Sequence, residues 1–239
     1  DVWHLAANSD IPAGVSDPLI DLRDTFLTTF SLANAFKIKP PKKFLFASSS
    51  AIYGDMGKNY IKESSAPLFP ISNYGAMKLA SEAYLSSWIE KNHTRLIVFR
   101  FPNVVGVPST HGVILDFIKK LSNNPNKLNV LGDGKQRKPY LLVEDLISAM
   151  LFILENTNNK REVFNIGPKD SGIEVSDIAK MVCSLTGNSN AEIIYENSNR
   201  GWVGDVPKFE YDISKLEKLG WSNKNDSSTS IKIAIQQII

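Results

Sequence analysis

The chain has 239 residues, 43% of them hydrophobic, which is enough to bury a sizeable core in one or two domains. Its formal net charge of +2 is too small to suggest a nucleic-acid-binding surface. The single cysteine, Cys183, excludes an intrachain disulfide and a cysteine-rich metal site, so we expect no metal and a reducing, cytoplasmic location. No apolar run reaches the ~18–20 residues of a membrane span, and we expect no membrane partner.

The first elements in the chain are a predicted strand and a predicted helix. Residues 1–7 are typical of a buried strand that ends in small side chains, where a ligand can approach the backbone of an open α/β sheet. His4 lies in this strand, and we expect it to be a hydrogen-bonded core residue rather than a catalytic base. Apolar residues at helical spacing predict a helix over residues 18–36.

The next stretch carries the candidate chemistry. A short apolar run at 43–47 predicts a strand that ends at Ser48-Ser49-Ser50, and helical periodicity begins near Tyr74. Tyr74 and Lys78 are four residues apart and therefore share one helix face. A cation near a phenol lowers its pKa from about 10, and a serine hydroxyl can join the same pocket. Such a set can move a proton to or from a substrate hydroxyl.

The Tyr-x-x-x-Lys spacing alone also fits an ordinary surface helix pair. The serine-rich strand end, with Ser49 lying 25 residues before Tyr74, favours the catalytic interpretation. With it, the stretch resembles the extended short-chain dehydrogenase/reductase family, in its nucleotide-sugar epimerase/dehydratase branch. The likeness is greatest to the UDP-glucose (UDP-galactose) 4-epimerases.

The resemblance implies an α/β fold, a Rossmann-like doubly wound parallel sheet with a smaller C-terminal α/β substrate domain. It implies Ser49, Tyr74 and Lys78 as catalytic residues that also contact cofactor, with Tyr74 as acid/base. Lys78 would hold the nicotinamide ribose of NAD and tune Tyr74. The family's opening Gly-x-x-Gly-x-x-Gly turn and its first βα units are absent from this chain. We expect about 60–70 residues to be missing, since each βαβ unit takes upward of ~30.

Further motifs follow in the family's order and imply further contacts. Where the family has an Asn-Asn pair, this chain has Asp24-Thr25, and Lys138 stands where the family has an arginine that reaches nucleotide phosphate. Residues 100–106 resemble the family's Arg-x-x-Asn-x-x-Gly segment. The implied cofactor contacts are Leu5, Ala6, Ala7, Ser9, Thr25 and Pro102. The implied substrate contacts, besides Ser49 and Tyr74, are Asn103, Val113, Lys138, Arg200 and Asp205.

The remaining periodic segments predict helices over 109–121, 143–154 and 174–185 and strands over 95–101, 128–131, 163–167 and 191–195. A polar connector over 222–230 leads into a last helix. Cys183 lies among apolar residues of a predicted helix and is expected to be a core thiol. The resemblance divides the chain into an NAD-binding domain, 1–107 plus 141–168, and a nucleotide-sugar-binding domain, 108–140 plus 169–239.

The implied reaction is epimerisation at C4 of a nucleotide sugar, with a UDP-hexose as the expected partner, by transient oxidation to the 4-keto sugar. A 4,6-dehydratase is an alternative, but those enzymes carry an Asp-Glu pair where this chain has Ser50-Ala51. A nucleotide-sugar reductase and a non-catalytic binding protein remain open. The family often dimerises through two helices of each subunit, so we expect a homodimer that includes the helix over residues 74–91.

Overall fold

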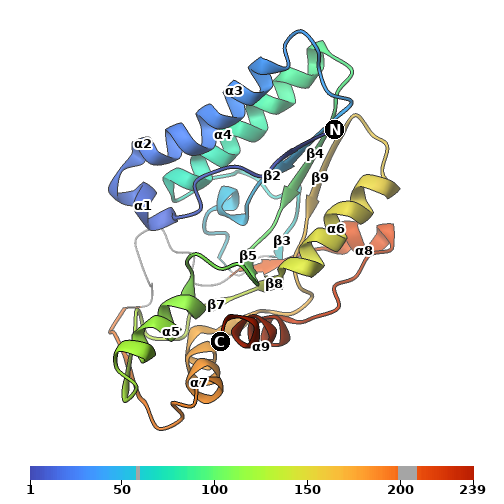
Figure 1. Cartoon of the computed structure of the whole chain (residues 1–239). Helices are drawn as coiled ribbons and strands as arrows, with labels where there is room; N and C mark the ends of the chain where they lie inside the picture. Colours follow the sequence, from blue (N-terminus) through green and yellow to red (C-terminus); the bar gives the residue numbers. More distant parts are fainter. Residues whose placement is uncertain (58–59, 199–208) are drawn as a thin grey trace.

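The computed structural model describes residues 1–57, 60–198 and 209–239. A four-stranded sheet runs through the larger part of the molecule (Figure 1). Its strands lie in the order β1-β2-β4-β9, and all three pairings are parallel. Their bounds are β1 Val2–His4, β2 Lys43–Ala47, β4 Arg95–Arg100 and β9 Arg161–Asn165. The predicted α/β fold with a parallel sheet is confirmed.

Helices cover both faces of this sheet, because its strands are apolar on both sides. Phe44 and Phe46 of β2 belong to a core with Leu85 and Ile89, where α3 and α4 lie side by side. Leu45, between them, belongs to a second core that α6 and α8 cover. The helix bounds here are α3 Thr28–Ala35, α4 Asn73–Trp88, α6 Val143–Asn156 and α8 Ser214–Leu219.

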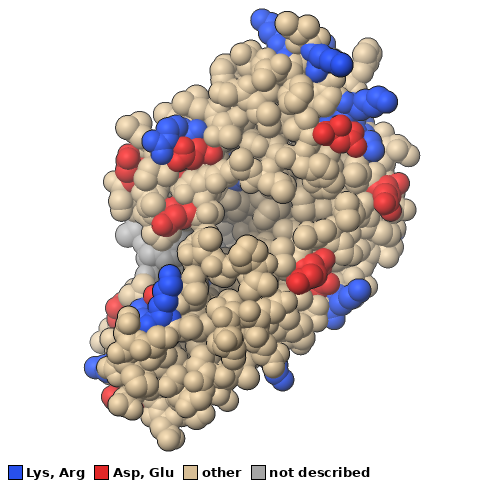
Figure 2. All heavy atoms as spheres, viewed as in Figure 1, with Lys and Arg blue, Asp and Glu red and all other residues tan. Residues whose placement is uncertain are grey.

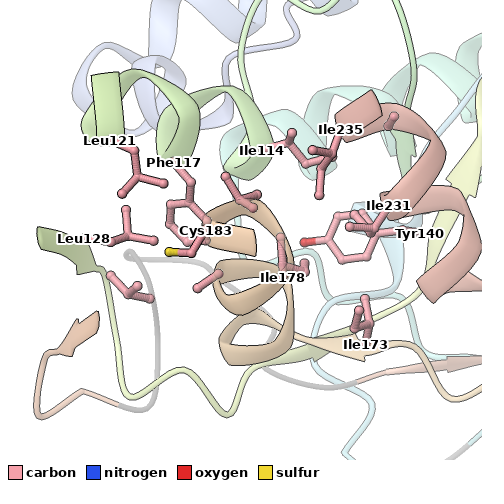
Figure 3. Close-up of a cluster of buried hydrophobic side chains, with 14 residues drawn as sticks. Ile114, Phe117, Leu121, Leu128, Tyr140, Ile173, Ile178, Cys183, Ile231 and Ile235 are labelled. Carbon is pink, nitrogen blue, oxygen red and sulfur yellow. The ribbon is translucent and has the colours of Figure 1, made fainter. Parts of the chain in front are cut away.

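A third core fills the smaller part of the molecule (Figure 3). It joins α5 (Val113–Asn123), α7 (Val175–Leu185) and α9 (Ser227–Ile238). Cys183 is buried in it at 4% exposure, which confirms that this residue is a core thiol. The division of the chain into the two expected domains stays a prediction.

Short strand pairs complete the fold. They are β3 (Tyr60–Ile61) with β12 (Glu210–Tyr211), β5 (Asn103–Val105) with β8 (Tyr140–Leu142), β6 (Lys127–Val130) with β11 (Glu192–Tyr195), and β7 (Arg137–Lys138) with β10 (Ile173–Glu174). The short helical segments are α1 Ile11–Ser16, α2 Pro18–Asp21, η1 Leu22–Leu27, η2 Ser50–Tyr53 and η3 Ile89–Lys91.

Two local expectations need correction. The helix expected over 18–36 is helical from Pro18 to Ala35, but its middle part, η1, is π-helical. The polar connector was expected to extend to Ser230, and this is wrong for its last four residues. Asp226 accepts a hydrogen bond from the Thr229 amide at 2.7 Å and so begins α9 at Ser227.

The molecular surface is hollowed between the part that carries α1 to α4 and the part that carries α5 (Figure 2). Within residues 1–57, 60–198 and 209–239, no helix is long and apolar enough to cross a membrane.

Candidate active site

Ser49 and Tyr74 come from separate segments and meet at the carboxyl end of β2. Ser49 caps η2, where its hydroxyl accepts a hydrogen bond from the Ala51 amide at 3.1 Å. Ser72 caps α4 by accepting from the Gly75 amide at 3.1 Å, which places Tyr74 in the first turn of this helix. The side chains of Ser49 and Tyr74 interact through a hydrogen bond that favours the phenolate. The structure thus brings together the two hydroxyl groups that the sequence singled out.

Gly75 permits this meeting. A Cβ at position 75 would lie 2.4 Å from the carbonyl oxygen of Ala51, much closer than any real Cβ contact. The first turn of α4 therefore packs directly on the backbone of η2. A side chain on Gly75 would push the two elements apart and separate Tyr74 from Ser49.

Lys78 is buried near the Tyr74 ring, with 2% of its surface exposed. Its ammonium donates a hydrogen bond to the carbonyl of Ala47 at 2.6 Å and lies 5.7 Å from the centre of the Tyr74 ring. Burial lowers the pKa of Lys78 to about 8, against the opposing effect of the nearby Glu82 charge. Lys78 is the cation expected in this cluster.

The pKa of Tyr74 is raised rather than lowered. Burial raises it to about 12, the hydrogen bond with Ser49 opposes the rise, and the charge of Asp21 adds to it. The expectation that Lys78 would lower this pKa is wrong for the protein alone, because desolvation of the phenol outweighs any nearby attraction. The Tyr74 phenol therefore keeps its proton at neutral pH in this state.

Asp21 is a site residue that sequence reasoning missed. It is fully buried, and its Oδ1 accepts a hydrogen bond from Asn8 Nδ2 at 2.8 Å. Its Oδ2 has no hydrogen-bond partner among the described residues. Burial raises the pKa of Asp21. The available signal was spacing, since Asp21 lies one helical turn before Thr25, an expected cofactor contact.

The expected cofactor residues lie at the end of β1 and nearby. Leu5, Ala6 and Ser9 are exposed and Ala7 is half-buried, so the backbone at this strand end is accessible. The Thr25 hydroxyl is buried and accepts a hydrogen bond from the Asn8 amide at 3.2 Å. Pro102 is buried beyond the end of β4. Small, accessible residues at the carboxyl end of a parallel strand are typical of the place where an open α/β sheet binds a dinucleotide.

His4 is a core residue, as expected. Its Nε2 lies 2.8 Å from the Thr29 hydroxyl, and burial lowers its pKa to about 4. Its ring contacts those of Phe44 and Phe46, at 5.9 Å and 5.5 Å between ring centres. These contacts confirm the structural role that its apolar strand indicated.

The expected substrate residues lie on more widely separated elements than the expected cofactor residues do. Asn103 is exposed at the start of β5, Val113 begins α5 and packs against the third core, and Lys138 is half-buried in β7. Arg137, beside Lys138, donates to Glu174 at 2.9 Å and to the Gly172 carbonyl at 2.9 Å. Arg200 and Asp205 lie outside the described residues. The substrate contacts stay predictions.

Comparisons with known proteins agree with this arrangement. The model of the NAD dependent epimerase/dehydratase family matches residues 1–167. The chain belongs to this family of NAD-dependent enzymes, and the predicted family and NAD as cofactor are confirmed.

Individual relatives and solved structures are similar to this chain over nearly its whole length. A putative UDP-glucose 4-epimerase of Methanocaldococcus jannaschii is 31% identical over 97% of this chain and 74% of its own length. A crystal structure of UDP-galactose 4-epimerase has a TM-score of 0.88 at 33% identity, covering 99% of this chain and 76% of that one. The Thermotoga maritima UDP-glucose 4-epimerase with UDP-glucose has a TM-score of 0.86 at 29% identity, with the same coverage of 99% and 76%. The Rossmann-like fold is thereby confirmed.

Proposed function

We propose that the protein catalyses epimerisation at C4 of a UDP-hexose of the UDP-glucose/UDP-galactose type. The observation that carries this proposal is the convergence of Ser49, Tyr74 and Lys78 at the end of β2. The similarity to proteins named UDP-glucose 4-epimerase supports the choice of sugar nucleotide.

In this mechanism Tyr74 is the group that moves the proton. Its phenolic oxygen takes the proton of the sugar 4-hydroxyl during oxidation and returns a proton during reduction. Ser49 forms a hydrogen bond with the same sugar oxygen and positions it. Bound NAD supplies a hydride acceptor and donor and a positive charge beside the phenol.

The positive charge of Lys78 would favour the ionised form of Tyr74. In the protein alone, burial holds the Tyr74 proton in place, with a pKa of about 12. A base is needed for oxidation, so charges that favour the phenolate must act when the site is loaded. Lys78 lies 5.7 Å from the Tyr74 ring and can supply one of them. It also carries the donor that would hold the ribose.

Binding contacts follow from the same proposal. Leu5, Ala6, Ala7, Ser9, Thr25 and Pro102 would line the cofactor site with the catalytic residues. Asn103, Val113 and Lys138, with Arg200 and Asp205, would contact the nucleotide sugar. Lys138 would neutralise a phosphate as a point charge without the bidentate grip of arginine.

The other activities of the family are less well supported. A 4,6-dehydratase needs carboxyl groups at the positions of Ser50 and Ala51, and η2 offers none there. A reductase would use the same catalytic set with an exchangeable cofactor. A non-catalytic binding protein would not need the hydroxyl pair that Ser49 and Tyr74 form.

We also propose a homodimer. Leu27 and Phe30, on the helical segment beside α4, are 42% and 41% exposed, and Phe30 contacts Tyr84 at 5.2 Å between ring centres. A second copy would bury this apolar face. Its test is the molecular mass of the protein in solution.

The test of the activity is a conversion assay. The NAD-loaded protein is incubated with UDP-glucose, and UDP-galactose is measured by chromatography. We expect interconversion without net consumption of added NADH. Formation of a dehydrated 4-keto-6-deoxy sugar, or net NADH oxidation, would point to one of the alternative activities.

A further inference from the structure

A buried ion pair is connected to the candidate active site through Ser48, the residue before Ser49. Glu82 of α4 and Arg100 at the end of β4 are joined by two contacts, Oε2 to Nη2 at 2.7 Å and Oε1 to Nε at 3.1 Å. Their side chains are 9% and 8% exposed. Burial alone would lower the pKa of Arg100, but the Glu82 charge reverses this and raises it. The pair is therefore charged, bidentate and desolvated.

Glu82 also holds the residue next to the catalytic serine. The Ser48 hydroxyl donates a hydrogen bond to Oε1 of Glu82. The Ser48 amide donates to the carbonyl of Phe99 at 2.8 Å. The side chain and the backbone amide of Ser48 are thus both fixed by hydrogen bonds. Because Ser49 is the next residue, a fixed Ser48 also orients the backbone that carries the Ser49 side chain.

Glu82 faces Lys78 as well. The two residues are four apart in α4, so they share one face of the helix. The Glu82 charge raises the pKa of Lys78 against the effect of burial. Among the described residues, the other titratable groups facing Lys78 are His4 of β1, whose pKa of about 4 leaves it neutral, and the Tyr74 phenol. Glu82 is the anion that supports the Lys78 charge.

Arg100 also forms hydrogen bonds with residues other than Glu82. Its Nη1 donates to the Tyr53 hydroxyl at 2.9 Å and to the Glu63 carbonyl at 3.0 Å. Tyr53 in turn donates to Asn165 Oδ1 at 2.7 Å. Arg100 is thereby fixed by contacts that do not involve the active site, and it holds Glu82 in place.

We propose that Glu82 is a positioning residue of the active site: it fixes Ser48 and thereby Ser49, and its carboxylate, paired with Arg100, supplies negative charge on the helix face that carries Lys78. This inference deepens the proposed function and rests on it for the roles of Ser49 and Lys78.

The test compares Glu82→Gln with Arg100→Gln. Each variant leaves one buried group unpaired and is less stable, so stability does not separate a positioning role from a structural one. Titration of Lys78 does, followed by NMR of its side-chain ¹³Cε signal and assigned with Lys78→Arg. Loss of the anion moves the pKa of Lys78 down, and loss of the cation moves it up, each by about one pH unit. An unchanged Lys78 pKa, or shifts in the same direction, would overturn the proposal.

Ser48→Ala gives an answer even if the charge variants do not fold. It removes one hydroxyl and leaves the ion pair intact. We expect kcat for sugar-nucleotide conversion to fall about tenfold with KM unchanged, since a looser Ser49 affects the reacting oxygen more than binding. An unchanged kcat would contradict the positioning of Ser49. The Lys78 titration needs no turnover, so absence of conversion by the wild type would reject the proposed function alone.

Discussion

The ammonium of Lys78 lies 5.7 Å from the centre of the Tyr74 ring, but its hydrogen bond goes to the carbonyl of Ala47. Both side chains are pushed toward their neutral forms, with pKa values of about 8 for Lys78 and about 12 for Tyr74. Burial is the main cause in each case. At neutral pH the Tyr74 phenol and the Lys78 ammonium both keep their protons, so binding must favour the phenolate before Tyr74 can act as a base.

The depressed pKa of Lys78 predicts a pH dependence of stability. In the unfolded chain this pKa is near 10.5 and in the folded protein about 8, so the unfolded state binds more protons between these values. The free energy of unfolding should therefore rise with pH across this window, by up to about 3 kcal/mol from this group. In Lys78→Met the rise is absent. Urea unfolding of both proteins at pH 7.5 and pH 10 measures the difference, and parallel behaviour would contradict it.

Asp21 is predicted to destabilise the folded protein at neutral pH. Burial raises its pKa, so the folded state binds more protons than the unfolded state above pH 3.8, and stability falls as pH rises through the folded pKa. Asp21→Asn keeps an oxygen for Asn8 and removes the charge. We expect a gain of about 1–2 kcal/mol in the free energy of unfolding at pH 7.

The matched control for this substitution is Asp24→Asn. It removes the same charge from the adjoining turn, but Asp24 is 41% exposed and pairs with the exposed Arg23. Its effect on stability should be much smaller than that of Asp21→Asn, because solvent screens the charge of Asp24. Equal effects of the two variants would show that burial of Asp21 is not the cause.

Gly75→Ala tests whether the approach of α4 to η2 sets the distance between the two hydroxyl groups. The added Cβ meets the Ala51 carbonyl at 2.4 Å, so the first turn of α4 must move. We expect kcat to fall about a hundredfold and stability to fall by about 1–3 kcal/mol. Ala76→Ser, at the next position, is the control and should leave kcat unchanged. Wild-type kcat in Gly75→Ala would mean that the contact does not position Tyr74.

Much of this site could be predicted from the sequence because its signals are local. The strand before Ser48 is recognised from a run of consecutive apolar residues. The helix that carries Tyr74 and Lys78 is recognised from the spacing of residues within one segment. The core roles of His4 and Cys183 followed from apolar surroundings within their own elements.

The remainder depends on contacts between distant segments. The Glu82–Arg100 ion pair joins a helix to a strand. Neither segment alone carries a pattern that predicts which residue pairs with the other. The burial of Asp21 depends on how α1, α2 and α4 pack around it. The direction of the Tyr74 pKa shift depended on its desolvation, which only the packed structure supplies. Arg200 and Asp205 stay predictions from family resemblance.

The central claim is that Tyr74 moves the proton at C4 of a UDP-hexose, and Tyr74→Phe in the NAD-loaded protein tests it most directly. We predict that the wild type interconverts UDP-glucose and UDP-galactose, while the variant binds UDP-glucose with little change but loses at least about a thousandfold in kcat. A variant that retains wild-type turnover, or a wild type that binds UDP-glucose and forms no UDP-galactose, would contradict the account.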